Sequence, residues 1–320
     1  RFFWEVCTNL HQLSAMNLSI IIPTKDRGNI FDQTLDALAT ATEGLDVEII
    51  VVNDSTRTTP TIPKSLTNVN LVQNDGRGVA SARNRGAAMA KFQNLLFMDD
   101  DFLVERKHIL SVLESLAKED SRIVLFNWEY PPALRKTLST NRFGRYLEHF
   151  GFTSLRGWLQ SGWREGDVFE LDGGASYFLP IRKEVFLSLG GYDERFTHAR
   201  AEDYDFVQRA RKAGIRFYLD STKLILHNER DRFEPTAFLE RKKRNGETIA
   251  IAARLGYTEL AVNYPAGKYF LFKALSSIKP LLIGMVNRLP DYEGIDFIYY
   301  RMMNVLLAIY FFEGYTEERP

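Results

Sequence analysis

Short apolar runs alternate with helical periodicity over the first hundred residues of the chain. Residues 18–23 and 47–52 are rich in β-branched side chains, which is typical of strands buried in a parallel sheet. Between these runs Phe31, Leu35 and Leu38 recur at helical spacing, and Gly44 supplies a stop signal. The pattern predicts a β-α-β unit.

The alternation continues beyond this unit. A polar loop over residues 55–68 precedes a short strand at 69–73, a helix rich in Ala and Arg at 78–91 and a further apolar strand at 95–98. Strands that alternate with helices favour a doubly wound, mostly parallel, Rossmann-like sheet flanked by helices. Ligands of such sheets bind beyond the carboxyl ends of the strands.

The pattern changes after Leu103. It predicts helices at 108–117, 183–189 and 202–213, strands at 123–127, 217–219 and 224–226, and an irregular aromatic stretch through Trp163. The tail from Phe233 carries basic and apolar clusters and is expected to be mainly helical.

Composition narrows the class of protein. The 320 residues include 41 basic and 41 acidic side chains, so net charge indicates no general affinity for nucleic acid. Cys7 is the single cysteine, which excludes an internal disulfide and fits a cytoplasmic location. The longest apolar stretch, residues 302–312, is shorter than the roughly 20 residues that cross a bilayer, so no membrane span is expected.

Three consecutive aspartates, Asp99 to Asp101, follow the apolar strand at 95–98. Two carboxylates separated by one residue can hold a hard divalent cation, Mg²⁺ or Mn²⁺, which would bridge the phosphates of a bound substrate. A solvated acidic turn is the alternative. Thr24 and Asp54 follow the first and second strands and are expected in the same crevice.

Six segments occur in an order that resembles the family 2 glycosyltransferases. They are SIIIPTKDR, VVNDST, GVASARNRGAAMA, LLFMDDD, GGYDERF and AEDYDFVQRARKAG, and they cover about residues 18–228. The resemblance implies a GT-A fold with a helical C-terminal extension. It also implies a nucleotide-sugar-binding half at 18–103 and an acceptor-binding and catalytic half at 104–232, between extensions at 1–17 and 233–320.

The resemblance assigns donor-binding roles to several residues. Asp54 corresponds to the family's nucleobase contact, and a carboxylate there can accept the imide N–H of uracil or thymine. Arg83 resembles the arginine that approaches the base or the diphosphate, for which a guanidinium is suited. The remaining implied donor contacts are Pro23, Thr24, Arg27, Asp99, Gly173 and Gly174, the two glycines because small residues permit close approach.

The pair Glu202 and Asp203 resembles the acidic pair at which the family places its catalytic base. Direct displacement at an anomeric carbon needs one carboxylate to accept the acceptor's proton, and Asp203 is assigned that role, with Glu202 orienting the acceptor or the base. Acids at a helix N-terminus are the alternative. His227 resembles a third metal ligand beside Asp99 and Asp101, whereas a lone histidine is also commonly structural.

The sequence therefore predicts an inverting, metal-dependent hexosyl- or hexosaminyltransferase that uses a nucleotide sugar, with UDP as the commonest nucleotide in the family. The acceptor is a hydroxyl of a glycan, a lipid-linked intermediate or another molecule, in glycan or polysaccharide biosynthesis, and transfer of a single sugar is favoured. A nucleotidyltransferase and a non-catalytic nucleotide-sugar or carbohydrate-binding module are the alternatives. The tail leaves two options open: peripheral membrane contact, or packing against the catalytic domain or a second subunit.

Overall fold

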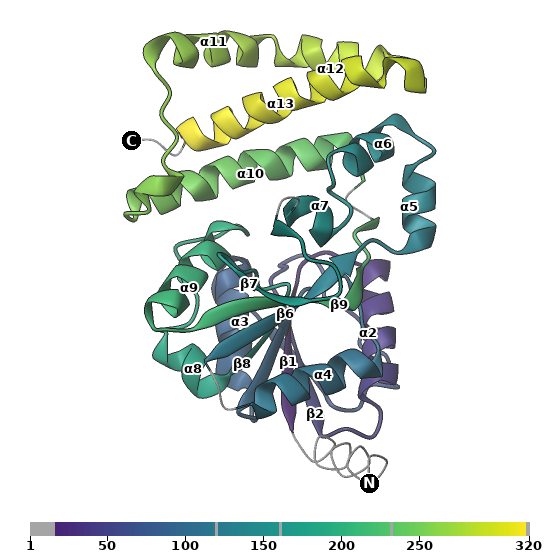
Figure 1. Cartoon of the computed structure of the whole chain (residues 1–320), viewed down its shortest axis with the longest axis vertical. Helices are drawn as coiled ribbons and strands as arrows, with labels where there is room; N and C mark the ends of the chain where they lie inside the picture. The colour runs from purple at the N-terminus through teal and green to yellow at the C-terminus, as the bar shows by residue number, and fades with distance from the viewer. Residues whose placement is uncertain (1–16, 119–120, 160–161, 231–232, 318–320) are drawn as a thin grey trace. The chain divides into compact units, whose positions relative to one another are not determined.

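The computed structural model describes residues 17–118, 121–159, 162–230 and 233–317 (Figure 1). Cys7 and nearly all of the extension expected at 1–17 lie outside these ranges. The chain divides into two compact units. The first comprises the described parts of residues 17–130, Leu159–Thr197 and Glu202–Asn228, and the second those of Pro131–Trp158, His198–Ala201 and residues 229–317.

The first unit is built on a five-stranded sheet whose central strands are the predicted apolar runs. The strand order is β3-β2-β1-β4-β8, with β8 antiparallel to β4 and the other pairs parallel. Every residue of β1, β2 and β4 is buried, as expected of strands covered on both faces. The strands are β1 (Leu18–Thr24), β2 (Val47–Asn53), β3 (Val69–Gln73), β4 (Asn94–Met98) and β8 (Phe178–Arg182).

Helices α2 (Asn29–Thr42) and α3 (Gly78–Met89) connect these parallel strands. The strand order reverses direction after β3, so right-handed crossovers place the two helices on opposite faces of the sheet. Gly86 brings α3 close to the sheet, because a Cβ atom there would collide with the side chain of Ile21. The other helices of this unit are α4 (Arg106–Ala117), α8 (Lys183–Ser188) and α9 (Ala201–Lys212).

A second, smaller sheet follows the strand order β5-β9-β6, and β7 also pairs with β9. The two short strands predicted at 217–219 and 224–226 are one continuous strand, β9, so that prediction was wrong. A register shift at Phe126 and Asn127 lets the polar stretch around Ser221 stay within the strand, where the Ser221 N–H donates to the carbonyl of Asp167. The strands are β5 (Phe102–Leu103), β6 (Arg122–Glu129), β7 (Val168–Leu171) and β9 (Arg216–His227).

Within the described residues, every regular element of the second unit is a helix. Its long helices α10 and α13 pack closely through Gly246 and Gly314, where an added Cβ atom would meet the backbone of the other helix. The helices are α5 (Pro132–Leu138), α6 (Arg142–His149), α7 (Leu155–Leu159), α10 (Pro235–Arg254), α11 (Ala266–Ser277), α12 (Lys279–Arg288) and α13 (Asp296–Glu317), with short 3-10 turns at Thr258–Leu260 and Glu293–Ile295.

The stretch expected to be irregular through Trp163 contains three helices, α5 to α7, so that expectation was wrong. The Asn141 side chain caps α6 by accepting a hydrogen bond from the Gly144 N–H at 2.8 Å. Phe143 and Tyr146 on α6 pack edge-on against Phe238 of α10. The aromatic residues therefore form a helical core. The mixed α/β sheet and the helical C-terminal part confirm the predicted fold class.

One apolar segment is longer than the sequence indicated. The 3-10 turn and α13 together run over Glu293–Glu317, which is long and apolar enough to cross a membrane by length and composition alone. The expectation that no segment reaches that length was wrong, because helical residues on both sides of 302–312 extend it. Within its most apolar window, 39% is buried inside the protein.

Candidate active site

Polar side chains collect where the parallel strands β1, β2 and β4 end. Thr24 is paired in register with Asn53, and the backbone N–H of Asp54 donates to the carbonyl of Thr24 at 2.8 Å. Asp99 immediately follows β4, and its N–H donates to the carbonyl of Tyr177 at 2.9 Å. The carboxyl ends of these strands thus share one edge of the sheet, which is where a doubly wound sheet binds ligands.

A buried arginine joins the first aspartate of the triplet to the acidic pair of α9. Arg83, on α3, is 3% exposed. Its Nη2 donates to Asp99 Oδ1 at 3.0 Å, and its Nη1 contacts Glu202 Oε1 at 3.1 Å and Asp203 Oδ1 at 3.3 Å. The structure therefore brings together four residues that the sequence singled out, from α3, the end of β4 and the start of the distant helix α9.

Two residues that the sequence analysis did not single out hold Asp203 in place. The Ser176 hydroxyl donates to Asp203 Oδ1 at 2.5 Å, and the Ser176 N–H donates to Oδ2 at 3.2 Å. The Tyr192 hydroxyl in turn donates to Ser176 Oγ at 2.5 Å, and Arg83 lies over the Tyr192 ring at 5.2 Å. Tyr192 lies within the GGYDERF segment and Ser176 directly follows Gly173, Gly174 and Ala175, so their segments carried the only signal.

The charges in this cluster change the acidity of its members. Burial by itself lowers the pKa of Arg83, but the surrounding groups, Asp203 foremost, outweigh it and raise that pKa above its usual range. Loss of solvent raises the pKa of Asp99 to about 6 even though 35% of its side chain is exposed, against the opposing effect of Arg83. Arg83 therefore stays charged and balances several carboxylates.

The second and third aspartates of the triplet face other partners. Thr24 Oγ1 donates to Asp100 Oδ2 at 2.7 Å, and Arg27 Nε donates to Asp100 Oδ1 at 2.8 Å. Arg27 Nη2 also binds Asp101 Oδ2. Thr24 and Arg27, both implied donor contacts, thus hold the aspartate turn in the described structure, and Arg27 is largely buried while doing so.

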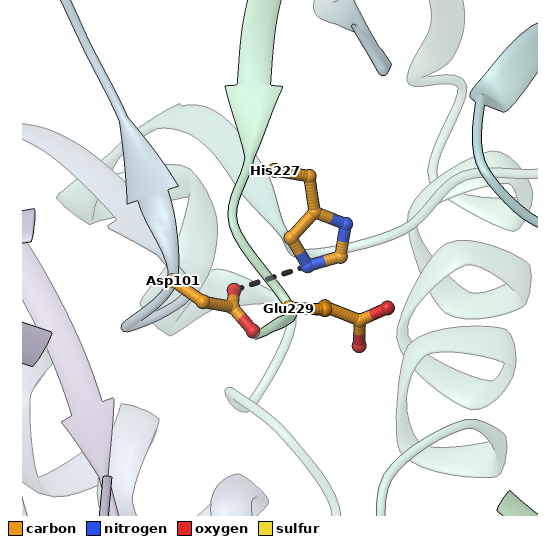
Figure 2. A group of neighbouring side chains, drawn as sticks. All are labelled: Asp101, His227 and Glu229. Atoms are coloured by element: carbon orange, nitrogen blue, oxygen red, sulfur yellow. Dashed lines mark ion pairs between the residues drawn. The ribbon is translucent and has the colours of Figure 1, made fainter. Parts of the chain in front are cut away.

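His227, at the end of β9, lies beside Asp101. Its Nε2 is 3.1 Å from Asp101 Oδ1, and Figure 2 shows the imidazole pointing toward that carboxylate. The ring stacks on Phe102 with centroids 4.3 Å apart and meets Trp128 edge-on at 4.9 Å. Strand pairing explains the approach, because Phe102 on β5 is the register partner of His227.

A group able to bind a metal includes this pair. Ligand atoms of Asp101, His227 and Glu229 all lie within 4.8 Å of one another (Figure 2). Glu229, which the sequence analysis missed, follows His227 by two residues, and its only advance signal was the acidic side chain itself. Carboxylate oxygens and an imidazole nitrogen are ligands that Mn²⁺ and Mg²⁺ accept, so the donor set fits such a cation.

Asp54 occupies a different part of the same strand edge. Its Oδ1 accepts hydrogen bonds from Asn74 Nδ2 at 2.7 Å and from the Gly78 N–H at 3.1 Å, and Lys25 Nζ lies 3.0 Å from Oδ2. These bonds fix the carboxylate at the start of α3. These partners of Asp54 differ from the carboxylates that Arg83 contacts.

Three implied donor contacts have other surroundings. Pro23 is buried within β1. Gly173 has open space where a Cβ atom would lie, which is compatible with close approach of a ligand. At Gly174 a Cβ atom would lie 2.7 Å from the Phe217 ring and 3.0 Å from Val207, so packing against these residues is itself a reason for glycine.

The strand edge, the aspartate triplet and the acidic pair of α9 belong to a mixed α/β fold of the GT-A type. A family model described as glycosyl transferase family 2 matches residues 19–169. The match spans a little less than half of this chain and agrees with the resemblance to the family 2 glycosyltransferases.

Two curated relatives agree with this assignment. A validoxylamine A glucosyltransferase from Streptomyces hygroscopicus subsp. jinggangensis is 40% identical over 107 residues, which are 31% of this chain and 25% of that protein. An uncharacterized glycosyltransferase from Haemophilus influenzae is 28% identical over 195 residues, covering 59% of this chain and 60% of that protein. The chain thus spans a quarter of the first relative's length and less than two thirds of the second's.

A solved structure shares the fold. A mannosyltransferase from Pyrobaculum calidifontis, in complex with GDP-Man and Mn²⁺, matches with a TM-score of 0.51 at 15% identity. The match covers 96% of this chain and 92% of that one. At this level of identity the likeness concerns the arrangement of helices and strands.

Proposed function

We propose that this protein is an inverting, metal-dependent glycosyltransferase that moves a hexosyl or hexosaminyl group from a UDP-sugar to a hydroxyl acceptor. One observation carries the proposal. Arg83 joins Asp99, at the end of β4, to Glu202 and Asp203, at the start of α9. The buried guanidinium of Arg83 thus holds both Asp99, which is expected to face the donor phosphates, and Asp203, which is expected to face the acceptor.

Asp203 is proposed as the base. The acceptor oxygen attacks the anomeric carbon, its proton passes to the Asp203 carboxylate, and the bond from that carbon to the diphosphate oxygen breaks with inversion. The nucleoside diphosphate leaves with the bonding electrons. Ser176 and Arg83 hold the carboxylate at fixed geometry, and 19% of the side chain is exposed, so an acceptor can reach it. Glu202 is fully buried and positions Arg83 and thereby the base.

Asp99, Asp101 and His227 are proposed to hold the divalent cation, Mn²⁺ or Mg²⁺, with Glu229 close by. Such a cation neutralises charge that develops on the departing diphosphate. Arg27 and His227 both contact the Asp101 carboxylate, which keeps that buried group paired. The Mn²⁺ bound to the Pyrobaculum mannosyltransferase supports this part of the proposal by analogy of fold.

Asp54 is proposed to receive the nucleobase, with Pro23, Thr24, Arg27, Gly173 and Gly174 around the donor. The support is the position of Asp54 at the end of β2, fixed by Asn74 and the N-terminal backbone of α3. We place the protein in the cytoplasm, in the synthesis of a glycan or polysaccharide. The acceptor is a hydroxyl of a glycan or a lipid-linked intermediate.

Calorimetric titration of UDP, dTDP and GDP with and without Mn²⁺ tests the donor and metal sites. UDP is expected to bind the wild type in a Mn²⁺-dependent manner, and Asp101→Asn is expected to abolish that dependence. Asp167→Asn, an exposed aspartate at the edge of β7, is the matched control and should bind like the wild type. Nucleotide binding that ignores Mn²⁺ in the wild type would contradict the metal site.

A second variant separates binding from catalysis. Asp203→Asn keeps the shape of the side chain but removes the base, so it should retain Mn²⁺-dependent UDP binding while losing sugar transfer, measured as UDP release from a panel of UDP-sugars with sugar acceptors. The loss is expected to be roughly 100-fold or more. Equal transfer by Asp203→Asn and wild type would remove Asp203 from the role of base.

A further inference from the structure

The helices α11 and α12 expose an unusual amount of apolar surface within the second unit. No residue of α11 is buried, although it carries the sequence YFLF, and in α12 only Val286 is buried. Phe270 is 67% exposed, Leu271 57% and Leu281 60%. We call the following exposed side chains the apolar face: Phe270, Leu271, Ile278, Leu281, Met285, Tyr292, Phe297, Ile298 and Val305. An exposed apolar surface of this extent marks an interaction site.

Positive charge accompanies the apolar face. Residues 266–288 contain Lys268, Lys273, Lys279 and Arg288 and no aspartate or glutamate. Lys279 is bound by Glu313 at 2.6 Å, whereas Lys268 and Lys273 lie over tyrosine rings, 5.2 and 5.9 Å from the ring centres. These two lysines and Arg288 therefore give the segment a net positive character that an anionic surface would complement.

Two of the three acids at residues 289–296 are engaged by an arginine of the same unit, and the third, Glu293, is exposed. Asp291 and Asp296 both accept hydrogen bonds from Arg145, at 2.7 and 2.6 Å. Lys268, Lys273 and Arg288 are exposed and can meet an external partner, while the carboxylates of Asp291 and Asp296 are engaged inside the unit.

The type of residue indicates which partner this is. Lysine is depleted in protein–protein interfaces, whereas lysines beside exposed Phe, Leu and Tyr are typical of helices that lie in the headgroup region of a membrane. Lysine stems can follow apolar surface while their ammonium groups reach the phosphates. An open pocket of about 160 Å³ on α12 and α13, lined by Leu282, Met302, Val305 and Arg301, offers apolar space beside a cation.

The lengths of the helices distinguish lying on the membrane from crossing it. α11 has 12 residues and α12 has 10, and the pair is bent by 60°. Neither alone reaches the roughly 20 residues of a straight span, and although the pair together has the length and composition of one, the bend interrupts it. α13 is long enough, but it packs against α10, α11 and α12, and part of its apolar surface is already covered.

We propose that α11 and α12, with the N-terminal part of α13, form a membrane-binding surface that inserts the apolar face between the headgroups of an anionic bilayer. This surface lies outside the proposed catalytic residues and does not depend on which sugar is transferred. It commits the chain to a peripheral association in which Lys268, Lys273 and Arg288 contact anionic headgroups.

Vesicle sedimentation with the full chain tests the proposal. Vesicles of phosphatidylcholine with phosphatidylglycerol should bind the protein at low salt, more strongly than vesicles of phosphatidylcholine alone. The double variant Phe270→Ser/Leu271→Ser should weaken binding to both vesicle types at least roughly tenfold, because two large apolar side chains are removed. The matched control is Met89→Ser/Leu187→Ser, which alters two exposed apolar residues of the first unit and should bind like the wild type.

A charge variant tests the electrostatic part. Lys268→Gln/Lys273→Gln should lower binding to the anionic vesicles roughly tenfold or more and should reduce the dependence on salt, with phosphatidylcholine binding unchanged. Lys64→Gln/Lys118→Gln, two exposed lysines of the first unit, is the control. Metal-dependent UDP binding, measured without vesicles, should be the same in all four variants, which keeps this test independent of the proposed function.

Two outcomes would overturn the proposal. One is an absence of sedimentation with vesicles of either composition. The other is a wild-type dimer in light scattering that Phe270→Ser/Leu271→Ser converts to a monomer without any vesicle binding, since the apolar face would then be covered by a second copy of the chain.

Discussion

The guanidinium of Arg83 lies 3.3 Å from the carboxylate of Asp203, across 120 residues of sequence. The same guanidinium also contacts Asp99 and Glu202, so one cation balances three carboxylates in a region with little solvent. Carboxylates gathered in this way repel one another without a cation between them. Arg83 is therefore needed to hold these carboxylates together, apart from any contact that it makes with a ligand.

The variant Arg83→Met should destabilise the first unit. Removing one partner from a buried ion pair typically costs about 3–5 kcal/mol, because the remaining charges are left uncompensated. Urea unfolding followed by circular dichroism measures the loss. Arg85→Met, on the same helix, breaks an exposed contact with Asp75 and should cost at most about 1 kcal/mol. Equal losses of unfolding free energy in the two variants would show that the buried contacts of Arg83 stabilise the protein no more than the exposed contact of Arg85.

The sequence predicted the parts of the site that depend on strand ends. The carboxyl ends of parallel strands meet at one edge, so Thr24, Asp54 and Asp99 could be placed together from the apolar runs that precede them. Asp203 and His227 required the resemblance to a family, because no local pattern links a helix start or a distant strand end to β4. Their assigned roles remain predictions, whereas their proximity to Asp99 and Asp101 is observed.

Other features depend on tertiary packing and left little trace in the sequence. Ser176 and Tyr192 are ordinary residue types whose importance comes from the chain of hydrogen bonds that leads to Asp203. The continuity of β9 depends on a shift of its register against β6, in which residues 221–223 of β9 have no partner, and periodicity does not reveal such a shift. The helices α5 to α7 were missed because they are only 7, 8 and 5 residues long, which is too short for helical periodicity to stand out.

Ser176→Ala should lower the rate of transfer with little change in donor binding. The variant removes a hydroxyl that donates to Asp203, and one hydrogen bond to a charged group contributes about 1.5–3 kcal/mol. We expect kcat to fall roughly tenfold or more and the KM for the donor to stay within about twofold. Ser188→Ala, which removes an exposed hydroxyl bonded only to a carbonyl of its own helix, is the control. A rise in donor KM with unchanged kcat would assign Ser176 to donor binding instead.

Two glycine substitutions should have opposite effects on stability. Gly86→Ala forces a methyl group against Ile21 where α3 meets the sheet, and such overpacking costs about 1–3 kcal/mol. Gly267→Ala, near the start of α11, meets nothing within 4 Å and should be neutral or stabilise the helix by up to about 1 kcal/mol. Thermal unfolding measures the stability of both variants against the wild type. A Gly86→Ala variant as stable as the wild type would mean that α3 can shift away from the sheet at little cost.

The ion pair between Arg145 and Asp296 should make the second unit sensitive to acid. Hydrogen bonds from Arg145 lower the pKa of Asp296 below its usual range. Stability from this pair is fully present above the unfolded pKa of about 3.9 and is lost as the pH falls through the lower folded pKa. Asp296→Asn should thus cost about 1–2 kcal/mol at pH 7 and almost nothing at strongly acidic pH.

Urea unfolding of the wild type and Asp296→Asn, at pH 7 and at strongly acidic pH, measures the difference in their free energies of unfolding. Glu293→Gln, an exposed acid in the 3-10 turn before α13, serves as the control and should change stability little at either pH. A constant difference between wild type and Asp296→Asn across the pH range would mean that the lost stability comes from packing and not from the charge of Asp296.

His227 has two candidate roles that one substitution can separate. His227→Phe retains a flat aromatic ring to stack on Phe102 but removes the nitrogen that faces Asp101. If His227 binds the cation, this variant should fold normally and lose roughly tenfold or more in Mn²⁺ affinity, measured by titration in the presence of UDP. His149→Phe, on α6 in the second unit, is the matched control and should keep wild-type affinity. Unchanged Mn²⁺ affinity in His227→Phe would leave the imidazole with a packing role only, and the cation would then have to be held by carboxylates alone.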